Sequence, residues 1–458
     1  MLRAGVSRRG IAAAALASAS AVFLATACGT RVSAPPQTQL PVTAAPPGTT
    51  SPATANPASD IGVSPTTITV GLLVSRTSPL GPDVFSGSYY GATAYFDTLN
   101  QQGGIDGRQI KVVPCDDTGS GSGNVQCVHT LIDKDAIFAL AGTTAFSYDG
   151  DTYVNQKGVP DVGGQPVGNG YDTYAHLWNL YGSDEPRNGT IGWDGKLYAG
   201  TEVYRYFKDK LGAKRAAVVF YNVAPSQRFA LSIEAGLRKE GYSVREEQAD
   251  LGLANFDSIA VDIAGAKVDS VYDALDDTGN ERLCQALDAH HVKLKAKVTT
   301  TQGWTSTIAS DYKSSPTCRN SIYATGNTKN YDDRSKPGVA AFQDAVNRIF
   351  PSHQGKTSEW ELEGWASAQW LTDAMRSCGA QLTRKCVENY LRDQKSYTGH
   401  GLLTPRGFVV QRPAPTQRNC IDVARWQDSA DGGKGGWVSQ VADMSTTCFD
   451  SFELPYSP

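Results

Sequence analysis

The sequence lacks the short motifs by which several large enzyme classes are recognised. It contains no GxSxG nucleophile elbow, no GxxxxGK[ST] phosphate-binding loop, no GxGxxG turn and no HExxH zinc motif. The adjacent His290 and His291 lie in a predicted helix, where neighbouring side chains point in different directions, and the other histidines do not cluster. We therefore expect no catalytic residue, metal ion or cofactor, although an exported α/β hydrolase with dispersed site residues stays open as an alternative.

An excess of charge of one sign is also absent. The chain has 42 Lys and Arg against 46 Asp and Glu, which gives a formal net charge of −4, and the two signs are interspersed. Proteins that bind nucleic acid gather basic residues on one face. Nucleic acid is therefore not expected as a partner.

The N-terminal 27 residues have the pattern of an export signal. Arginines precede an apolar stretch of small residues, 11–27, that ends at Cys28. This order is typical of a bacterial signal peptide, 1–27, that is removed before a cysteine that becomes acylated. The apolar stretch falls short of the ~20 residues that span a bilayer. An ordinary secretory signal cleaved near Ala27, which would release the protein, is the alternative.

The segment 28–60 is rich in proline, threonine and alanine and has few bulky apolar residues. Such a segment does not bury enough apolar surface to offset the entropy of ordering, so we expect a disordered tether. The chain is thus predicted to be held by a lipid anchor on the extracytoplasmic face of a bacterial cell membrane.

Paired cysteines with the CxxC spacing of a structural zinc site are absent as well. Eight cysteines remain after Cys28, and an even number in an exported chain indicates disulfides, although spacing alone does not determine their connectivity. Sequential pairing is favoured because each pair closes a local loop. The expected pairs are Cys115–Cys127, Cys284–Cys318, Cys378–Cys386 and Cys420–Cys448.

From Thr66 onward, short apolar strands alternate with amphipathic helices in two series. The first series has strands over 68–74, 109–113 and 137–141 and helices over 85–102 and 125–133. The second has strands over 216–221, 243–248, 269–275 and 297–301 and helices over 196–211, 227–240, 258–264 and 280–291. Long helices follow over 339–350, 361–377 and 385–394. Alternation of this kind predicts βαβ units, and two series predict two α/β lobes with parallel sheets.

An ordered set of segments runs from about residue 61 to residue 412. It comprises TITVGLLVS, NQQGGIDGRQIKVVPCDD, FALAGTT, KRAAVVFYN, DSVYDALDDTG, EGWASAQWLTDAMRSCG and YTGHGLLTPRG. In this order the segments resemble the type I periplasmic solute-binding proteins, which serve importers of branched-chain amino acids and related solutes. The resemblance implies two Rossmann-like lobes with parallel sheets joined by a three-strand hinge.

The resemblance also implies a division of the chain. Lobe one would hold 61–185 and 332–399, and lobe two would hold 186–325 and 405–458, with hinge crossings near 184–188, 323–331 and 400–405. A protein of this kind captures a small polar or amino-acid-like solute between its lobes and delivers it to the permease and ATPase subunits of an ABC importer, as a monomer. A ligand-sensing or accessory envelope lipoprotein that uses the same clamp is the alternative.

Ligand contacts are expected where strand ends and helix starts meet at one edge of each sheet. In lobe one the candidates are Ser78, Thr143, Thr144, Phe146, Trp178 and Tyr181. In lobe two they are Tyr221, Ser226, Asp276, Gln302 and Trp304. The resemblance favours Thr143 and Thr144 as partners of a ligand carboxylate, although a Gly-Thr-Thr run also suits a turn and a helix N-cap. The aromatic residues equally suit a core.

The ligand class depends on the acidic residues of lobe two. Asp276 would pair with a ligand ammonium, although an aspartate beside Gly279 also suits a turn. After the following strand, amino-acid binders of the family place an acidic residue, whereas this chain has Gln302 and Trp304. This departure weighs against an α-amino acid as the ligand.

Overall fold

The computed structural model describes residues 56–78, 81–82, 85–165, 168–405, 407–409 and 411–457. The predicted signal peptide, Cys28 and most of the predicted tether lie outside the described residues. Of the helices that are described, none combines the length and apolar character needed to cross a lipid bilayer.

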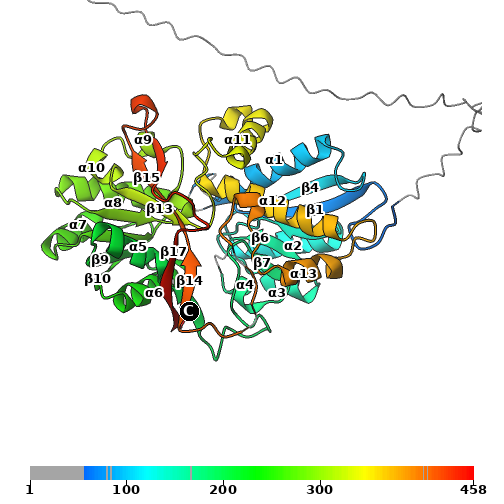
Figure 1. Cartoon of the computed structure of the whole chain (residues 1–458), viewed down its shortest axis with the longest axis horizontal. Coiled ribbons are helices and arrows are strands. Elements are labelled where there is room, and N and C mark those ends of the chain that lie inside the picture. Colours follow the sequence, from blue (N-terminus) through cyan, green and yellow to red (C-terminus); the bar gives the residue numbers. More distant parts are fainter. Residues whose placement is uncertain are drawn as a thin grey trace, which may run out of the picture. The chain divides into compact units, whose positions relative to one another are not determined.

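The first lobe is built on a five-stranded parallel sheet with the strand order β4-β1-β5-β6-β7. Its strands are β1 (Thr67–Val74), β4 (Gln109–Asp116), β5 (Ala139–Ala141), β6 (Asp161–Gly164) and β7 (Leu177–Asn179). The helices around it are α1 (Gly87–Gln101), α2 (Gly121–His129), α3 (Asp151–Gln156), α4 (Gly170–Thr173), α11 (Pro337–Ile349), α12 (Glu359–Ser377) and α13 (Arg384–Asp393) (Figure 1).

The two faces of strand β1 contact different groups of helices. Ile68, Val70 and Leu72 belong to one apolar cluster with residues of α1 and α12, whereas Leu73 belongs to another with residues of α2. Successive side chains of a strand point to opposite faces of the sheet, which explains this division. Helices therefore cover both faces of the sheet, as expected for parallel strands.

Helices α1 and α12 approach each other closely because glycines lie at their contact. A Cβ atom at Gly91 would lie 1.7 Å from the carbonyl oxygen of Glu361, and one at Gly364 would lie 2.3 Å from that of Ser88. Any larger residue at either position would push the helices apart. The N-terminal part of α12 is thus held firmly against the first lobe.

The second lobe contains a seven-stranded sheet with the order β10-β9-β11-β12-β13-β15-β16. The strands β9 (Arg215–Tyr221), β10 (Ser243–Ala249), β11 (Ser270–Ala274), β12 (Ala296–Thr299) and β13 (Ile322–Gly326) are parallel, and β15 (Asp422–Gln427) and β16 (Gly436–Ser439) are antiparallel additions. Its helices are α5 (Glu202–Leu211), α6 (Ala224–Lys239), α7 (Phe256–Gly265), α8 (Asp277–Ala289), α9 (Ile308–Asp311) and α10 (Pro316–Arg319). The expected class, two α/β lobes with parallel sheets, is confirmed.

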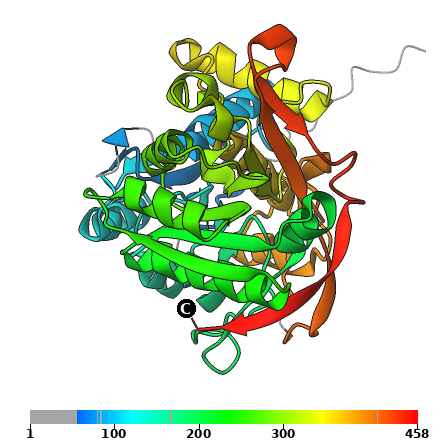
Figure 2. The ribbon, with the colours of Figure 1, turned by 90° about the vertical axis from the view of Figure 1, so that its left-hand side faces the viewer.

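A separate three-stranded antiparallel sheet has the order β14-β17-β8. Its strands are β8 (Leu197–Gly200), β14 (Thr416–Cys420) and β17 (Cys448–Tyr456), and Figure 2 shows β17 running along the outside of the second lobe. The helix predicted over 196–211 is therefore wrong at its start, because 197–200 pairs with β17 and the helix begins only at Glu202. A pairing partner so distant in the sequence overrides local propensity.

The chain segments between the lobes pair with one another. Ser183 N–H donates to the carbonyl oxygen of Gly407 and Val409 N–H donates to that of Ser183, at 3.3 and 3.1 Å. Thr404 N–H donates to the carbonyl oxygen of Asn327 at 2.7 Å, and Lys329 N–H donates to that of Leu402 at 2.8 Å. The segments that link the two lobes are thus ordered and run next to one another.

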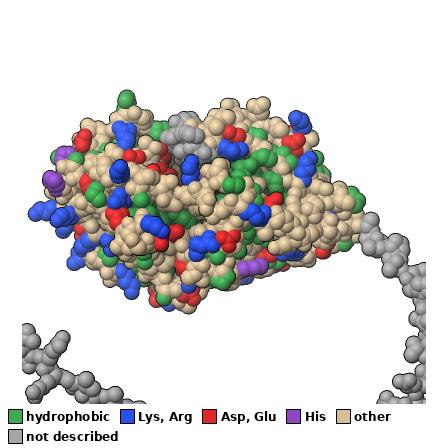
Figure 3. All heavy atoms as spheres, turned by 90° about the horizontal axis from the view of Figure 1, so that it is seen from above, with side chains coloured by type: hydrophobic (Ala, Val, Ile, Leu, Met, Phe, Trp, Pro, Cys, Tyr) green, Lys and Arg blue, Asp and Glu red, His purple; other side chains and the backbone are tan. Residues whose placement is uncertain are grey.

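Short elements complete the description. The hairpin strands are β2 (Thr77–Ser78) and β3 (Gly81–Pro82), and the single-turn helical segments are η1 (Thr130–Lys134), η2 (Thr301–Gly303), η3 (Pro351–His353), η4 (Gly399–Gly401) and η5 (Asp431–Gly433). On the face shown in Figure 3, basic and acidic side chains are interspersed, in keeping with the nearly balanced charge of the sequence.

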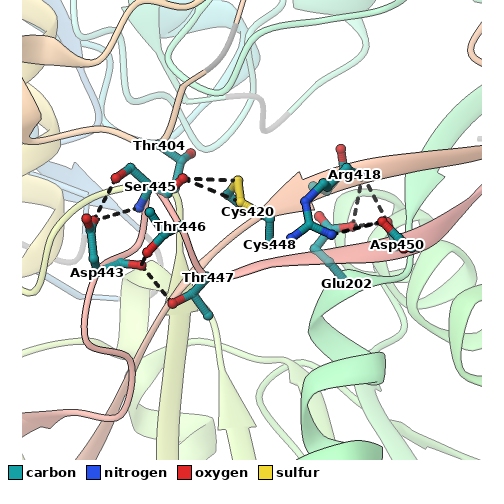
Figure 4. Close-up of a disulfide and its surroundings, with 12 residues drawn as sticks. Glu202, Thr404, Arg418, Cys420, Asp443, Ser445, Thr446, Thr447, Cys448 and Asp450 are labelled. Carbon is teal, nitrogen blue, oxygen red and sulfur yellow. Dashed lines mark hydrogen bonds and ion pairs between the residues drawn. A yellow bond between two sulfur atoms is a disulfide. The ribbon is translucent and has the colours of Figure 1, made fainter.

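The eight cysteines of the described chain form four disulfides. They are Cys115–Cys127, Cys284–Cys318, Cys378–Cys386 and Cys420–Cys448, the pairs that local spacing favours. Figure 4 shows the last of these joining β14 to β17, close to an ion pair between Arg418 and Asp450. Each bridge joins elements that already lie next to each other in the fold.

Replacing Cys115 and Cys127 together with alanine is expected to lower the free energy of unfolding by about 3 kcal/mol. The bridge spans 12 residues, and a loop of that length constrains the unfolded chain by about this amount. Urea unfolding of the oxidised protein and of the double variant measures the difference. An unchanged midpoint would mean that the bridge adds nothing to stability.

Candidate functional site

A cavity of about 410 Å³ is lined by residues of both lobes. The first lobe contributes Phe85, Phe146, Gly168, Asn169, Asp172, Tyr181 and Trp360. The second contributes Leu197, Tyr221, Val223, Pro225, Ser226, Arg228, Phe229, Ser232, Leu251, Ala274, Leu275, Asp276, Thr300, Gln302 and Tyr456. Most of these side chains are apolar or aromatic. A concave, largely apolar space with a few polar groups is typical of a small-molecule site.

Part of the predicted contact set lies in this cavity. Phe146, Tyr181, Tyr221, Ser226, Asp276 and Gln302 line it. Ser78, Thr143, Thr144, Trp178 and Trp304 are not among its lining residues. Four of these five belong to buried structural contacts, whereas Ser78 lies in the hairpin strand β2.

The two threonines after β5 form hydrogen bonds inside the first lobe. Thr143 Oγ1 donates to Asp161 Oδ1 at 2.9 Å, and Thr144 Oγ1 donates to the carbonyl oxygen of Gly142 at 3.2 Å. Both side chains are fully buried. Thr144 also pairs with Val74 of β1 in a parallel bridge, so the two threonines continue the strand arrangement and form neither a turn nor a helix N-cap.

The two tryptophans belong to the protein core. Trp178 packs under the guanidinium of Arg187, whose central carbon lies 4.2 Å from the ring centroid, and against Phe408. Trp304 is 0% exposed and its ring centroid lies 5.9 Å from that of Trp437. Packing therefore accounts for both residues.

A buried carboxylate fixes the loop that carries Phe146. Asp161, at the start of β6, accepts hydrogen bonds from Thr143, from Tyr148 at 2.6 Å and from Tyr171 at 2.8 Å. Burial raises the pKa of Asp161 to about 6, and the hydroxyl donors oppose this rise. The loop is further held because Phe146 N–H donates to Ser75 Oγ at 2.9 Å.

Aromatic rings from separate segments form one wall of the cavity. The ring centroid of Phe85 lies 5.6 Å from that of Phe146 and 5.6 Å from that of Trp360. Trp360 lies in the first turn of α12, and its Nε1–H donates to Thr301 Oγ1 of the second lobe at 3.0 Å. This side chain therefore belongs to the cavity wall and to the contact between the lobes.

Tyr181 connects the cavity to a buried acid of α12. Its hydroxyl oxygen lies 2.7 Å from Glu363 Oε1 and 2.8 Å from Gln165 Oε1. Burial raises the pKa of Glu363 to about 8, although Tyr181 and Gln165 oppose the rise. At neutral pH this carboxyl group is favoured in its protonated form.

The polar residues at the strand ends of the second lobe are bonded within that lobe. Tyr221 O–H donates to Asp276 Oδ1 at 2.6 Å, and Gly279 N–H donates to the same oxygen at 3.0 Å. Ser226 Oγ accepts from Tyr221 N–H and donates to the carbonyl oxygen of Ala274, both at 2.7 Å. Asp276 is the N-cap of α8, and Ser226 joins β9 to β11 at the cavity edge.

Two other polar atoms of the lining have no hydrogen-bond partner in the part of the chain that the structure describes. Gln302 Nε2 and Asn169 Oδ1 are buried and make no hydrogen bond among the described residues. A buried amide atom without a partner costs free energy, and a ligand that supplies the partner recovers it. These atoms mark places where a bound molecule would be held.

Several lining residues are absent from the set expected from the sequence. They are chiefly Phe85, Asn169, Arg228, Phe229 and Trp360. Arg228 and Phe229 lie on α6 and Trp360 on α12, where the helical spacing of apolar residues indicates packing. For Arg228, the available signal is its position directly after Ser226 and Gln227 at the start of α6, beside the expected edge of the sheet.

Metal ligation finds no support in this part of the protein. Across the described ranges, no group of three or more His, Cys, Asp or Glu is arranged to hold a metal ion. The lining of the cavity presents apolar surface, amides, hydroxyls, one guanidinium and the carboxyl groups of Asp172 and Asp276 to a bound molecule.

Solved structures of similar fold come from several bacteria. An extracellular ligand-binding receptor from Verminephrobacter eiseniae is 17% identical with a TM-score of 0.62, over 79% of this chain and 98% of that one. The branched-chain amino acid transporter substrate-binding protein LivJ from Streptococcus pneumoniae, in complex with isoleucine, is 16% identical with a TM-score of 0.61, over 82% and 100%. A fatty acid ABC transporter substrate-binding protein from Thermomonospora curvata is 14% identical with a TM-score of 0.61, over 85% and 94%.

At these identities the similarity concerns the fold. A search of curated proteins finds no match. The family comparison, in contrast, covers most of the chain. Residues 67–434 match the family described as periplasmic binding protein, and the two-lobed chain with its interlobe cavity therefore belongs to the periplasmic binding protein family.

Proposed function

We propose that the chain is an extracytoplasmic solute-binding lipoprotein that captures a small solute in the cavity between its lobes and delivers it to the permease and ATPase subunits of an ABC importer. Its family consists of extracytoplasmic solute-binding proteins, so the chain is a binding protein and not an enzyme. The observation that carries the proposal is the cavity of about 410 Å³ lined from both lobes. The printed names of the proteins from S. pneumoniae and T. curvata support an importer as the partner.

A lipid anchor on Cys28 is part of the proposed function. Removal of 1–27 and acylation of Cys28 would leave the segment 28–60 as a tether between the membrane and the lobes. Two or more acyl chains attach a protein stably, at ~0.8 kcal/mol per buried methylene. The protein would act as a monomer, with lobe one formed by 61–185 and 332–399 and lobe two by 186–325 and 405–458.

Closure on the solute has a physical basis in the hinge. Two lobes joined by ordered linking segments rotate as bodies, so a solute that contacts both lobes stabilises the closed arrangement. Trp360 and Tyr181 reach the cavity from one lobe, while Arg228 and Gln302 reach it from the other. A solute that touches both sets would be withdrawn from water on closure.

Filling the cavity is expected to abolish solute binding. Ser232→Trp places a large ring at a buried lining position of α6, whereas Ser258→Trp adds the same ring at an exposed position of α7. A true solute at a hundred times its Kd stabilises the parent protein by about 2.7 kcal/mol. Scanning fluorimetry over a broad solute library and native mass spectrometry of the purified protein measure this effect.

The parent protein and Ser258→Trp are expected to show the same solute-dependent rise in Tm, and Ser232→Trp none. Binding that survives in Ser232→Trp would place the site elsewhere. A parent protein that shows neither a Tm rise nor a bound mass would contradict solute capture.

A further inference from the structure

The cavity lining is apolar along most of its length and reaches solvent through apolar residues. Phe85, Phe146 and Trp360 form the aromatic wall of one lobe. Phe229 and Leu251 line the cavity from the other lobe and are also 43% and 37% exposed. Apolar side chains thus continue from the cavity wall to its mouth. Such a lining matches a molecule with an apolar body that extends toward the opening.

One cationic side chain reaches this apolar space. Arg228 is the only Lys or Arg among the described residues that line the cavity. Together with Asn169 it also lines a smaller adjoining pocket. Burial lowers the pKa of Arg228, while nearby Tyr456 and Asp172 oppose this change. A guanidinium remains charged in proteins, and it binds carboxylates through paired N–H donors.

Neutral polar atoms of the cavity are also suited to binding a carboxylate. Gln302 Nε2 is a buried donor without a partner among the described residues. Asn169 Oδ1 likewise has none there, and this position presents an oxygen or, after a flip, a nitrogen. Gln302 stands where an acidic residue would be needed to bind an ammonium. The lining therefore presents a cation and an amide donor to an oxygen-bearing group.

The acids of the lining are poor partners for an ammonium. Asp276 already accepts hydrogen bonds from Tyr221 and from the backbone of Gly279. Asp172 accepts from Ser183 Oγ at 3.0 Å and lies near the guanidinium groups of Arg187 and Arg228, whose charge opposes the rise in its pKa that burial causes. Neither acid offers an ammonium the free carboxylate that it requires.

On the basis of the solute-binding function proposed above, we infer that the solute is a monocarboxylic acid with an extended apolar or aromatic body and no α-ammonium group. Its carboxylate binds Arg228 and the Gln302 amide, and its body lies against Phe85, Phe146 and Trp360. This solute differs from the polar or amino-acid-like one expected from the sequence pattern. Free leucine and phenylalanine are excluded because their ammonium would be buried without an anionic partner.

Calorimetric titration of the mature protein tests the inference with four probes. These are octanoate, 4-phenylbutanoate, the neutral 4-phenylbutanamide and L-phenylalanine. The two carboxylates are expected to bind at least ten-fold more tightly than the amide, and L-phenylalanine to bind more weakly than either. Arg228→Gln is expected to weaken the carboxylates about ten- to a hundred-fold, as loss of a charged hydrogen bond does, and to leave the amide unchanged.

Two further variants make the test specific. Arg238→Gln removes an arginine from the same helix that is paired with Glu234 away from the cavity, and it is expected to change nothing. Gln302→Glu places a carboxylate in the lining. It is expected to weaken binding of both carboxylate probes and to improve binding of a fifth probe, the cation 4-phenylbutylamine.

The outcomes separate the inference from the function on which it rests. Tighter binding of L-phenylalanine than of 4-phenylbutanoate, or equal carboxylate binding by the parent and Arg228→Gln, would overturn the inference. A bound solute of another class, identified by mass, would also overturn it while supporting solute capture. Only the absence of any bound or stabilising small molecule would overturn both.

Discussion

Replacing Glu363 with glutamine is expected to remove part of the pH dependence of stability between about pH 5 and pH 8. In the folded protein burial raises the pKa of Glu363 to about 8, whereas the unfolded carboxyl group has the ordinary value of 4.5. Unfolding in this interval therefore releases a proton, and the free energy of unfolding falls as pH rises. Each group of this kind adds up to ~1.4 kcal/mol per pH unit to the slope of the free energy of unfolding against pH.

The glutamine amide keeps the shape of the neutral carboxyl group and its contact with Tyr181. Glu363→Gln is therefore expected to match the parent near pH 5 and to exceed it by roughly 4 kcal/mol near pH 8. Urea unfolding at a series of pH values measures the two slopes. The variant Glu363→Gln keeps a residual slope because burial also raises the pKa of Glu359 and raises that of Glu361 to about 7.

Asp209→Asn, at an exposed position of α5, is the matched control and is expected to follow the parent curve. Parallel curves for the parent and Glu363→Gln would show that Glu363 is ionised in the folded protein. In that event the group beside Tyr181 would be the Glu363 carboxylate and not the protonated acid.

Replacing Lys297 with methionine is expected to destabilise the second lobe by about 3–5 kcal/mol. Lys297 Nζ lies 2.9 Å from Asp273 Oδ2, and both side chains are 0% exposed. Lys297 also donates to Asn280 Oδ1, and Asn280 Nδ2 donates to Asp273 Oδ1 at 3.0 Å. Methionine matches the length of the lysine chain but leaves a buried carboxylate without its cation, and that loss is far more costly than loss of an exposed pair.

A double variant separates the ion pair from packing. Lys297→Met combined with Asp273→Leu removes both charges, and it is expected to recover most of the lost stability because desolvation of the pair costs about as much as its attraction returns. Calorimetric unfolding of the single and double variants supplies the comparison. A double variant as unstable as Lys297→Met alone would show that shape, and not the orphaned charge, causes the loss.

Local sequence patterns predict the parallel part of the fold well. Strands such as β1 and β9 are nearly continuous apolar runs, and a run of this kind indicates a strand buried on both faces. The strands after residue 405 lack this signal. β14 carries charged and amide side chains, and its pairing with β17 depends on contacts that no local window contains. Local sequence patterns therefore do not predict antiparallel pairing between strands that are far apart in the chain.

The candidate site is predictable only in part for a similar reason. The rule that ligands lie at strand ends finds Phe146, Tyr221 and Gln302, because each lies at or after the end of a recognisable strand. It does not find Trp360, since that residue reaches the cavity from a helix far along the chain. The rule also selects Thr143, whose hydroxyl donates to Asp161 and not to a ligand. That contact depends on the pairing of β5 with β6, which the local sequence does not show.

The pairing of β8 with β17 has a consequence for how the protein is made. Phe452 N–H donates to Thr201 Oγ1 across 251 residues of chain, so β8 finds its partner only after the last strand has been synthesised. Contacts of such separation form slowly. The three-stranded sheet β14-β17-β8 therefore cannot be completed until β17 has been synthesised, a delay that suits a polypeptide that passes through a translocon before it folds.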